Sequence, residues 1–304
     1  MFSELIDSVE NYIAVKNITP VIYNIEIKAN PEKDGLYQPK PEDLIKMVME
    51  VIKEKNLGPE RYQIQSFDVR QIQEVHENYP YVVTGFLTGN KDKTLKENLA
   101  VLGYVPQVYS PNYQLATPEL IEKVHSYGMK FVPWTVNELE DMKRLISWGV
   151  DGLIAQGAEA GGHLLGVEPA LEFATRALEV AGERPVFVAG GIADAADVRA
   201  VLDTGAAGAV AGTRFLLTDE SAAHPDYKRR VLAATRTVET TLFGMGWPAR
   251  HRVVENGATS RWLSPSGEVR PVPDRINAIA KVTEVDSLLT KGERWAGFIE
   301  APSA

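Results

Sequence analysis

The chain has 304 residues, of which 44% are hydrophobic, with a formal net charge of −9 and no cysteine. The size suits one α/β barrel with extensions, the charge argues against nonspecific nucleic-acid binding, and the lack of cysteine excludes disulfides, thiolate catalysis and Cys-based metal sites. No basic segment with an apolar run opens the chain, and no apolar stretch approaches the roughly 20 residues that span a bilayer. We therefore expect a cytoplasmic protein that binds neither membranes nor nucleic acid.

In the front part of the chain, residues 1–150, hydrophobic periodicity predicts five strands that alternate with helices. The predicted strands cover residues 21–28, 62–67, 82–87, 104–109 and 130–136. The predicted helices cover 3–16, 41–55, 94–102 and 138–148, and two more begin at 69 and 118. Asn137 is expected to cap the helix that follows it.

The back part continues the same alternation. Predicted strands six to eight cover 150–155, 185–189 and 207–211, and the helices between and after them cover 169–181, 193–203 and 227–236. Parallel strands separated by crossover helices predict an α/β fold, a single (β/α)₈ TIM barrel over residues 1–304. Residues 1–150 supply strands one to five, 151–240 supply strands six to eight, and 241–304 form a less regular C-terminal extension.

Residue usage changes abruptly near position 150. Residues 1–150 hold 13 Lys and 3 Arg, whereas residues 151–304 hold 3 Lys and 13 Arg, and ten of the 11 tyrosines precede the change. A solvated surface works with either basic residue, so folding does not require this switch. Two sources joined inside a predicted strand explain it; two ordinary domains with a boundary near 150 are the alternative.

Four short motifs in the front part support a separate origin: I-E-I-K at 25–28, Q-S-F at 65–67, W-T-V-N at 134–137 and G-V-D-G at 149–152. With them, residues 1–154 resemble glycerophosphodiester phosphodiesterases, which are metal-dependent (β/α)₈ hydrolases, without the first two strands of that family. The resemblance implies a metal ligand at Glu26, a phosphate contact at Lys28 and a pocket wall at Trp134. The family's other His, Glu and Asp motifs are missing, and Glu26 alone cannot hold a hard cation. We therefore expect a vestigial site without metal, with Glu26 and Lys28 paired to each other.

The back part carries longer motifs, listed here by residue: A-Q-G-A-E-A-G-G-H at 155–163, V-A-G-G-I-A-D at 188–194, G-T-R-F-L at 212–216, E-S-A-A-H-P-D-Y-K at 220–228 and G-M-G-W-P-A-R-H-R at 244–252. Residues 151–304 thereby resemble the C-terminal part of nitronate monooxygenases, also called 2-nitropropane dioxygenases. Those enzymes are FMN-binding barrels that oxidise alkyl nitronates with dioxygen. The resemblance implies a catalytic role for His163; a loop histidine with no substrate beside it is the alternative.

Glycines after the last strands favour a phosphate site on physical grounds as well. Backbone N–H groups of glycine can approach an anion closely, and a following helix adds the positive end of its dipole. The predicted cofactor-binding residues are Gln156, Gly157, Gly190, Gly191, Gly212 and Thr213. The expected ligand is a small molecule with a phosphate group, FMN, or otherwise phosphate or sulfate. Glycines that only serve tight turns are the alternative.

Three functions remain open at this point. The first is an FMN- or phosphate-binding barrel with weak or no oxidase activity, because the strands that normally cradle the flavin ring are replaced. The second is a catalytically silent chimeric scaffold, engineered or recombined. The third is a glycerophosphodiester phosphodiesterase that uses Glu26 and Lys28. The sequence does not predict the oligomeric state.

Overall fold

The computed structural model describes residues 2–17, 20–35, 38–218, 225–242, 250–266 and 268–270. The fold is α/β, with eight parallel strands that follow one another in the order of a (β/α)₈ barrel. These strands are β1 (Tyr23–Glu26), β2 (Tyr62–Ser66), β3 (Val83–Thr88), β4 (Val108–Pro111), β5 (Lys130–Phe131), β6 (Leu153–Gln156), β8 (Val186–Ala189) and β9 (Gly208–Val210).

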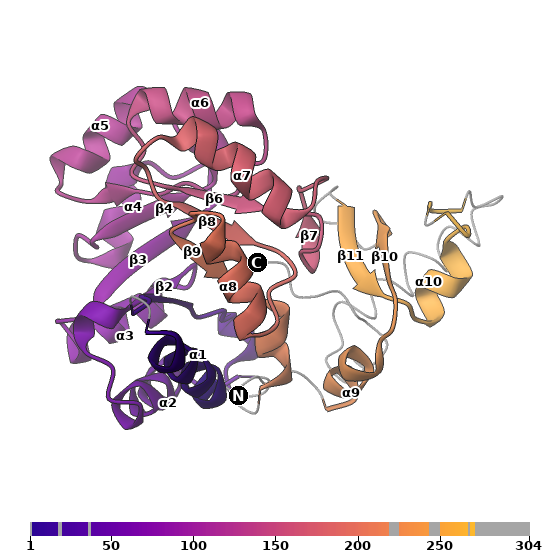
Figure 1. Ribbon diagram of the computed structural model, residues 1–304. Helices are drawn as coiled ribbons and strands as arrows, with labels where there is room; N and C mark the ends of the chain where they lie inside the picture. Colours follow the sequence, from indigo (N-terminus) through magenta and orange to yellow (C-terminus); the bar gives the residue numbers. More distant parts are fainter. Residues whose placement is uncertain are drawn as a thin grey trace.

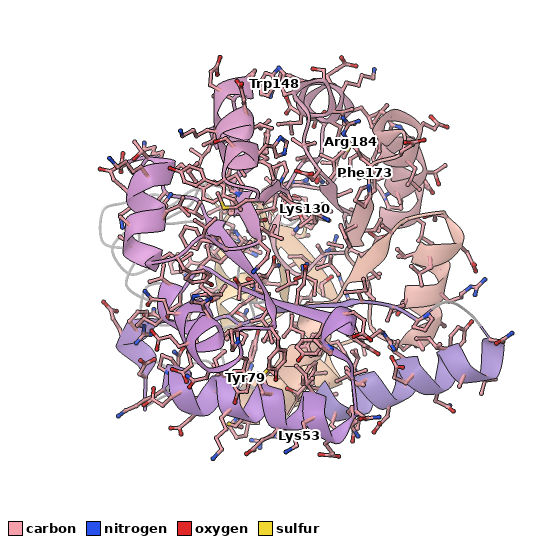
Figure 2. The ribbon with its side chains drawn as sticks, turned by 90° about the vertical axis from the view of Figure 1, so that its left-hand side faces the viewer. Lys53, Tyr79, Lys130, Trp148, Phe173 and Arg184 are labelled. Atoms are coloured by element: carbon pink, nitrogen blue, oxygen red, sulfur yellow. The ribbon has the colours of Figure 1, made fainter. Side chains whose placement is uncertain are left out.

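Helices surround the strands. They are α1 (Phe2–Lys16), α2 (Pro41–Glu54), α3 (Val69–Asn78), α4 (Leu95–Leu102), α5 (Pro118–Ser126), α6 (Leu139–Trp148), α7 (Ala170–Ala181) and α8 (Ala195–Asp203), with short 3₁₀ turns η1 (Pro31–Lys33), η2 (Pro59–Arg61), η3 (Tyr113–Leu115) and η4 (Thr213–Leu217). Figure 2 looks onto the face that carries Lys130, at the start of β5, and shows the helices arranged around the strands. Within the described ranges, every helix is too short or too polar to cross a membrane.

The parallel strands form two hydrogen-bonded sheets, β1-β2-β3-β4-β5 and β6-β8-β9. The sheets meet between β5 and β6, where the Asp151 N–H donates to the Phe131 carbonyl at 2.9 Å and the Val136 N–H donates to the Ile154 carbonyl at 3.2 Å. No ladder joins β9 to β1 in the part of the chain that the structure describes. Helix α1 instead contacts α8 on that side.

A smaller antiparallel sheet stands at the carboxyl end of the strands. It joins β7 (Gly162–Leu164) to β11 (Arg250–Val254) and β10 (Thr237–Thr240), between α9 (Pro225–Ala233) and α10 (Gly257–Trp262). Figure 1 shows β10, β11 and α10 to the right of the strand–helix body, with β7 between them and that body. The predicted irregular extension after residue 240 therefore contains a strand and a helix in its described part; residues 243–249 and 271–304 lie outside that part.

Two buried clusters fill the main body. The larger cluster crosses the β5–β6 junction, because Phe131 and Leu145 from the front part pack with Leu153, Phe173 and other back-part residues. The smaller cluster lies among α1, α2, β1 and β2, and every buried residue in it precedes position 83. A third, separate cluster under the β10–β11 hairpin contains Leu242, Val253 and Trp262.

Three sequence expectations are corrected at the ends of elements. The predicted strand 130–136 is regular only at Lys130–Phe131, although the N–H groups of Val132 and Trp134 still donate to the Tyr109 and Pro111 carbonyls of β4 at 3.2 and 3.0 Å. Strand β4 covers Val108–Pro111 rather than 104–109. Asn137 does not cap α6: Glu138 occupies the cap position without a side-chain bond, and the Asn137 side chain binds β6 instead.

Candidate functional site

The carboxyl end of β6 is fastened to the loop that precedes α6. Asn137 Nδ2 donates to the Gln156 carbonyl at 2.5 Å, and the Gln156 N–H donates to Asn137 Oδ1 at 3.1 Å. These bonds engage both backbone polar groups of Gln156, as a neighbouring strand would. The Gln156 side chain serves the following loop, where its Oε1 accepts the N–H of Leu165 at 2.9 Å. Gln156 therefore anchors the loop 157–166 at its origin.

Gly157 is required by close packing rather than by an unusual φ angle. A Cβ at this position would come within 2.4 Å of Ala170, at the start of α7. Its N–H donates to the Ala189 carbonyl of β8 at 2.8 Å, and its carbonyl accepts from the Ala160 N–H at 3.2 Å. The Gly157 amide is thus engaged by the sheet, although the residue lies directly beside the glycines that follow β8.

Gly190 and Gly191 follow β8 in the left-handed conformation, with φ angles of 113° and 73°, which glycine adopts without steric cost. Gly212 follows β9, and a Cβ there would meet no atom within 4 Å. The N–H groups of these three glycines have no hydrogen-bond partner among the described residues. Because β8 and β9 are paired through Ala189 and Val210, the open amides lie at the same rim, next to the exposed Thr213.

Beside this rim, three carboxylates accept hydrogen bonds from backbone N–H groups at the starts of helices. Glu159 Oε2 accepts the N–H of Ala170 at the start of α7 at 2.9 Å. Asp194 and Asp197 form a capping box on α8, so their oxygens accept the N–H groups of residues 193, 194, 196 and 197. These carboxylates offset the positive ends of both helix dipoles. An anion at this rim would rest on the amides of the glycine turns rather than on the helix ends.

His163 lies in β7, where its backbone is paired with that of His251 in β11. The side chain of His163 lies outside the described part of the structure, so its predicted catalytic role stays a prediction. His251 is buried, with 1% of its surface exposed. The glycine-rich loop therefore contains a strand whose partner comes from far along the chain, a pairing that local periodicity does not reveal.

Two arginines hold the β10–β11 hairpin against the same loop. Arg252 Nη2 and Nε donate to the Ala158 carbonyl at 2.6 and 2.9 Å, and Arg250 Nη2 donates to the Gly166 carbonyl at 3.3 Å. Glu239 of β10 pairs with both guanidinium groups. These roles of Arg250, Arg252 and Glu239 were not predicted from the sequence; the Arg-His-Arg alternation at 250–252, which places two arginines on one face of a strand, was the available signal.

The predicted vestigial residues lie at the ends of the front strands. Lys28 Nζ is 3.0 Å from Glu26 Oε1, so the expected mutual ion pair is present. Trp134 Nε1 donates to the Ser110 carbonyl at 2.9 Å, and its ring meets Phe67 edge-on with centroids 5.3 Å apart. No group of three or more His, Asp or Glu side chains that could hold a metal ion occurs in the described ranges.

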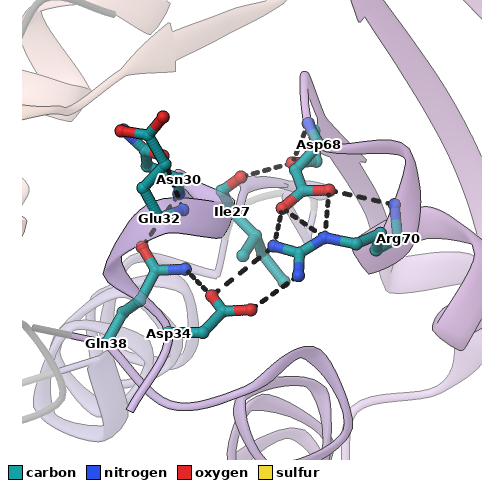
Figure 3. Close-up of polar contacts among 8 residues, drawn as sticks. Ile27, Asn30, Glu32, Asp34, Gln38, Asp68 and Arg70 are labelled. Carbon is teal, nitrogen blue, oxygen red and sulfur yellow. Dashed lines mark hydrogen bonds and ion pairs between the residues drawn. The ribbon is translucent and has the colours of Figure 1, made fainter. Parts of the chain in front are cut away.

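A polar network braces the loops after β1 and β2 (Figure 3). Arg70 donates to Asp34 at 2.6 Å and to Asp68 at 2.6 Å, and Gln38 Nε2 donates to Asp34 at 2.6 Å. Hydrogen bonds from Arg70 hold the pKa of Asp34 below its usual value. The Ser66 hydroxyl donates to the Ile27 carbonyl at 2.6 Å. This rim is therefore locked by its own side chains, whereas the rim after β8 and β9 presents open amides.

Comparison with known proteins gives two similarities. The nitronate monooxygenase family model matches residues 68–297. A probable nitronate monooxygenase of Bacillus subtilis is 31% identical over 217 residues, 65% of this chain and 59% of that protein. A glycerophosphodiester phosphodiesterase of Caldanaerobacter subterraneus is 35% identical over 138 residues, 45% of this chain and 53% of that protein.

Among solved structures, a nitroalkane oxidase from Streptomyces ansochromogenes matches 95% of this chain and 89% of its own, with a TM-score of 0.57 and 22% identity, which supports the fold. The chain spans only 41% to 59% of the length of four curated relatives that it matches, the two named above among them. The family match begins at residue 68 and thus reaches into the part that resembles a phosphodiesterase.

Proposed function

Because the chain belongs to the nitronate monooxygenase family, we propose that it binds FMN through the phosphate group, and binds phosphate or sulfate at the same place, with weak or no oxidase activity. The phosphate rests on the amides of Gly190, Gly191 and Gly212, with the Thr213 hydroxyl beside them. Bound FMN supplies a flavin that accepts electrons from a substrate, and His163 is the residue proposed to handle the substrate proton.

The open glycine amides are the observation that carries this proposal. Gly190 and Gly191 have left-handed φ angles, and a Cβ on Gly212 would meet no atom within 4 Å. Unpaired N–H groups that converge on one rim are a recurring anion-binding arrangement in proteins. The residues present fit the phosphate group of FMN. Strands that resemble a phosphodiesterase stand where the family's first strands cradle the flavin ring, and for that reason the oxidase activity is proposed to be weak or absent.

The test is a titration of purified protein with FMN, followed by quenching of flavin fluorescence, with inorganic phosphate as competitor. We expect FMN to bind and phosphate to compete. Gly212→Asp places a negative charge at the rim without a clash, and we expect it to weaken binding about tenfold or more through like-charge repulsion. When an alkyl nitronate is added to the FMN-loaded protein, we expect little or no oxygen uptake.

Gly257→Asp is the matched control, because a Cβ at Gly257 also meets no atom within 4 Å and the residue opens α10, in the hairpin lobe. The two variants have the same net charge and the same substitution. Failure of the wild-type protein to bind FMN or phosphate refutes the proposal. Equal FMN affinity in the two variants would show that the phosphate does not bind at Gly212.

A silent chimeric scaffold is the second candidate. The switch from lysine to arginine near residue 150 and the two family similarities support a join between two barrel families. The carboxylates of Glu159, Asp194 and Asp197 favour a rim without a bound anion, because they add negative charge next to the glycine turns. A cooperative unfolding transition in a protein that takes up no FMN, phosphate or sulfate would favour this candidate over the first.

A further inference from the structure

The Asn137 side chain, from the front part of the chain, holds the glycine loop of the back part at its origin. Its amide group donates to the Gln156 carbonyl and accepts from the Gln156 N–H, at 2.5 and 3.1 Å. Next to it the Val136 N–H donates to the Ile154 carbonyl at 3.2 Å. Asn137 therefore replaces a strand residue at the point where β5 has already ended, and it fixes the direction in which the chain leaves β6.

Gln156 in turn determines the position of the loop 157–166, because its side chain binds that loop. Its side-chain Oε1 binds the N–H groups of Leu165 and Gly166, at 2.9 and 3.5 Å, so one residue controls both ends of the loop 157–166. Farther along, the Ala158 N–H donates to the Glu168 carbonyl at 2.7 Å. A shift of Gln156 would therefore move the whole loop rather than one bond.

The loop in turn sets the space beneath Gly190. A Cβ on Gly190 would lie 3.1 Å from the Ala160 nitrogen and 3.2 Å from the Gly157 carbonyl oxygen, and one on Gly191 would lie 3.1 Å from the Glu159 side chain. A Cβ at either position would thus be crowded, and glycine, which lacks one, lets the loop lie close to the turn. A displacement of the loop is therefore expected to reach the turn after β8, because packed interiors transmit small displacements.

We propose that Asn137 is a positioning residue for the anion cradle: it sets the geometry of the Gly190–Gly191 amides through Gln156 and the loop 157–166, without contacting the ligand. The inference rests on the proposed function, because the cradle has to bind FMN or phosphate for its geometry to matter. Replacing Asn137 by Ala leaves both backbone groups of Gln156 without these partners and lets the end of β6 move.

The test compares Asn137→Ala with Gln107→Ala. Gln107 is matched because its side-chain amide also binds the backbone of a neighbouring strand, accepting the Thr84 N–H at 2.8 Å, but it precedes β4, at the amino end of the strands and away from the glycine rim. FMN affinity, the ³¹P NMR shift of bound FMN and the thermal midpoint without ligand are measured for both. We expect Asn137→Ala to weaken FMN binding about tenfold and to change the ³¹P shift, with Gln107→Ala lowering the midpoint only.

Asn137→Asp is a second variant: it keeps an oxygen that accepts from Gln156 but sets a carboxylate oxygen against the Gln156 carbonyl, so its affinity should fall at least as far as that of Asn137→Ala. A wild-type protein that binds FMN, with an Asn137→Ala variant of equal affinity and unchanged ³¹P shift, overturns this inference alone. A wild-type protein that takes up neither FMN nor phosphate overturns the proposed function, and this inference with it.

Discussion

The front and back parts of the chain meet twice, and the two junctions are built differently. Between β5 and β6 the backbones are joined by hydrogen bonds, the Asp151 carboxylate accepts the Phe131 N–H at 2.7 Å, and one buried cluster continues across. Between β9 and β1 no ladder is present in the described residues, and neither buried cluster of the main body crosses. Helix α1 packs on α8 there, around a cavity of about 10 Å³ lined by Ile13 and Leu202 among others.

The difference shows two ways to complete a ring of strands. A hydrogen-bonded junction specifies register, because a shift by one residue would turn every side chain to the other face. A helix-covered junction needs only complementary apolar surfaces and leaves register free. The first junction lies inside the G-V-D-G motif, whereas the second brings together the two ends of the barrel. Substitutions that remove buried apolar groups should therefore destabilise the second junction most. Substitutions that remove hydrogen-bonding groups should destabilise the first junction most.

The largest expected effect is at the helix-covered junction. Ile13→Ala removes a buried side chain that lines the α1–α8 cavity and should lower the free energy of unfolding by about 3 kcal/mol. Urea denaturation measures the change. Val15→Ala on the same helix, where the side chain is 69% exposed, is the control and should be neutral or slightly stabilising. A loss below about 1 kcal/mol for Ile13→Ala would show that α1 contributes little to closing the ring.

The hydrogen-bonded junction should respond to Asp151→Ala. The variant leaves the N–H of the fully buried Phe131 without its carboxylate acceptor and removes the 2.8 Å contact with His125 Nε2. An unpaired buried donor predicts a loss of about 2 kcal/mol, measured in the same denaturation experiment. Asp151→Asn keeps an acceptor oxygen and should retain most of the stability. Equal losses for Ala and Asn would mean that the charge facing His125, rather than the acceptor, holds this junction.

The smallest expected effect concerns the attachment of α1 to β1. The Tyr23 hydroxyl donates to Glu10 Oε1 at 2.6 Å, and burial, followed by this bond, raises the pKa of Tyr23 well above its ordinary value of 10.0. Because the folded protein keeps this proton when the unfolded chain loses it, the stabilisation is complete below pH 10 and declines as the pH rises further. Tyr23→Phe should cost about 1 kcal/mol at neutral pH and should flatten the decline.

Denaturation from pH 8 to 11, with exposed Tyr127→Phe as control, checks that expectation. The control should keep the alkaline decline of the wild type, because Tyr127 lies on the surface after α5. A Tyr23→Phe protein whose stability falls as steeply as that of the wild type above pH 10 would show that the Tyr23 hydroxyl does not cause the alkaline decline.

Much of the fold follows from local pattern, and much of the site does not. The order of strands and helices is confirmed, since each buried strand carries its own apolar run. The three kinds of glycine could not be told apart from sequence: Gly157 packs against α7, Gly190 holds a left-handed turn, and Gly212 lies in open space. The roles of Asn137 and Arg252 depend on partners distant in the chain, and no local periodicity encodes such partners.

The pairing of β7 with β11 has a consequence for how this chain can be shortened or rearranged. A polypeptide cut ahead of Arg250 would strip β7 of its antiparallel neighbour and Ala158 of its guanidinium donor, so the hairpin is no detachable appendage. Truncation libraries and circular permutants should therefore tolerate new termini better in exposed surface turns of the front part than anywhere between Gly162 and Val254.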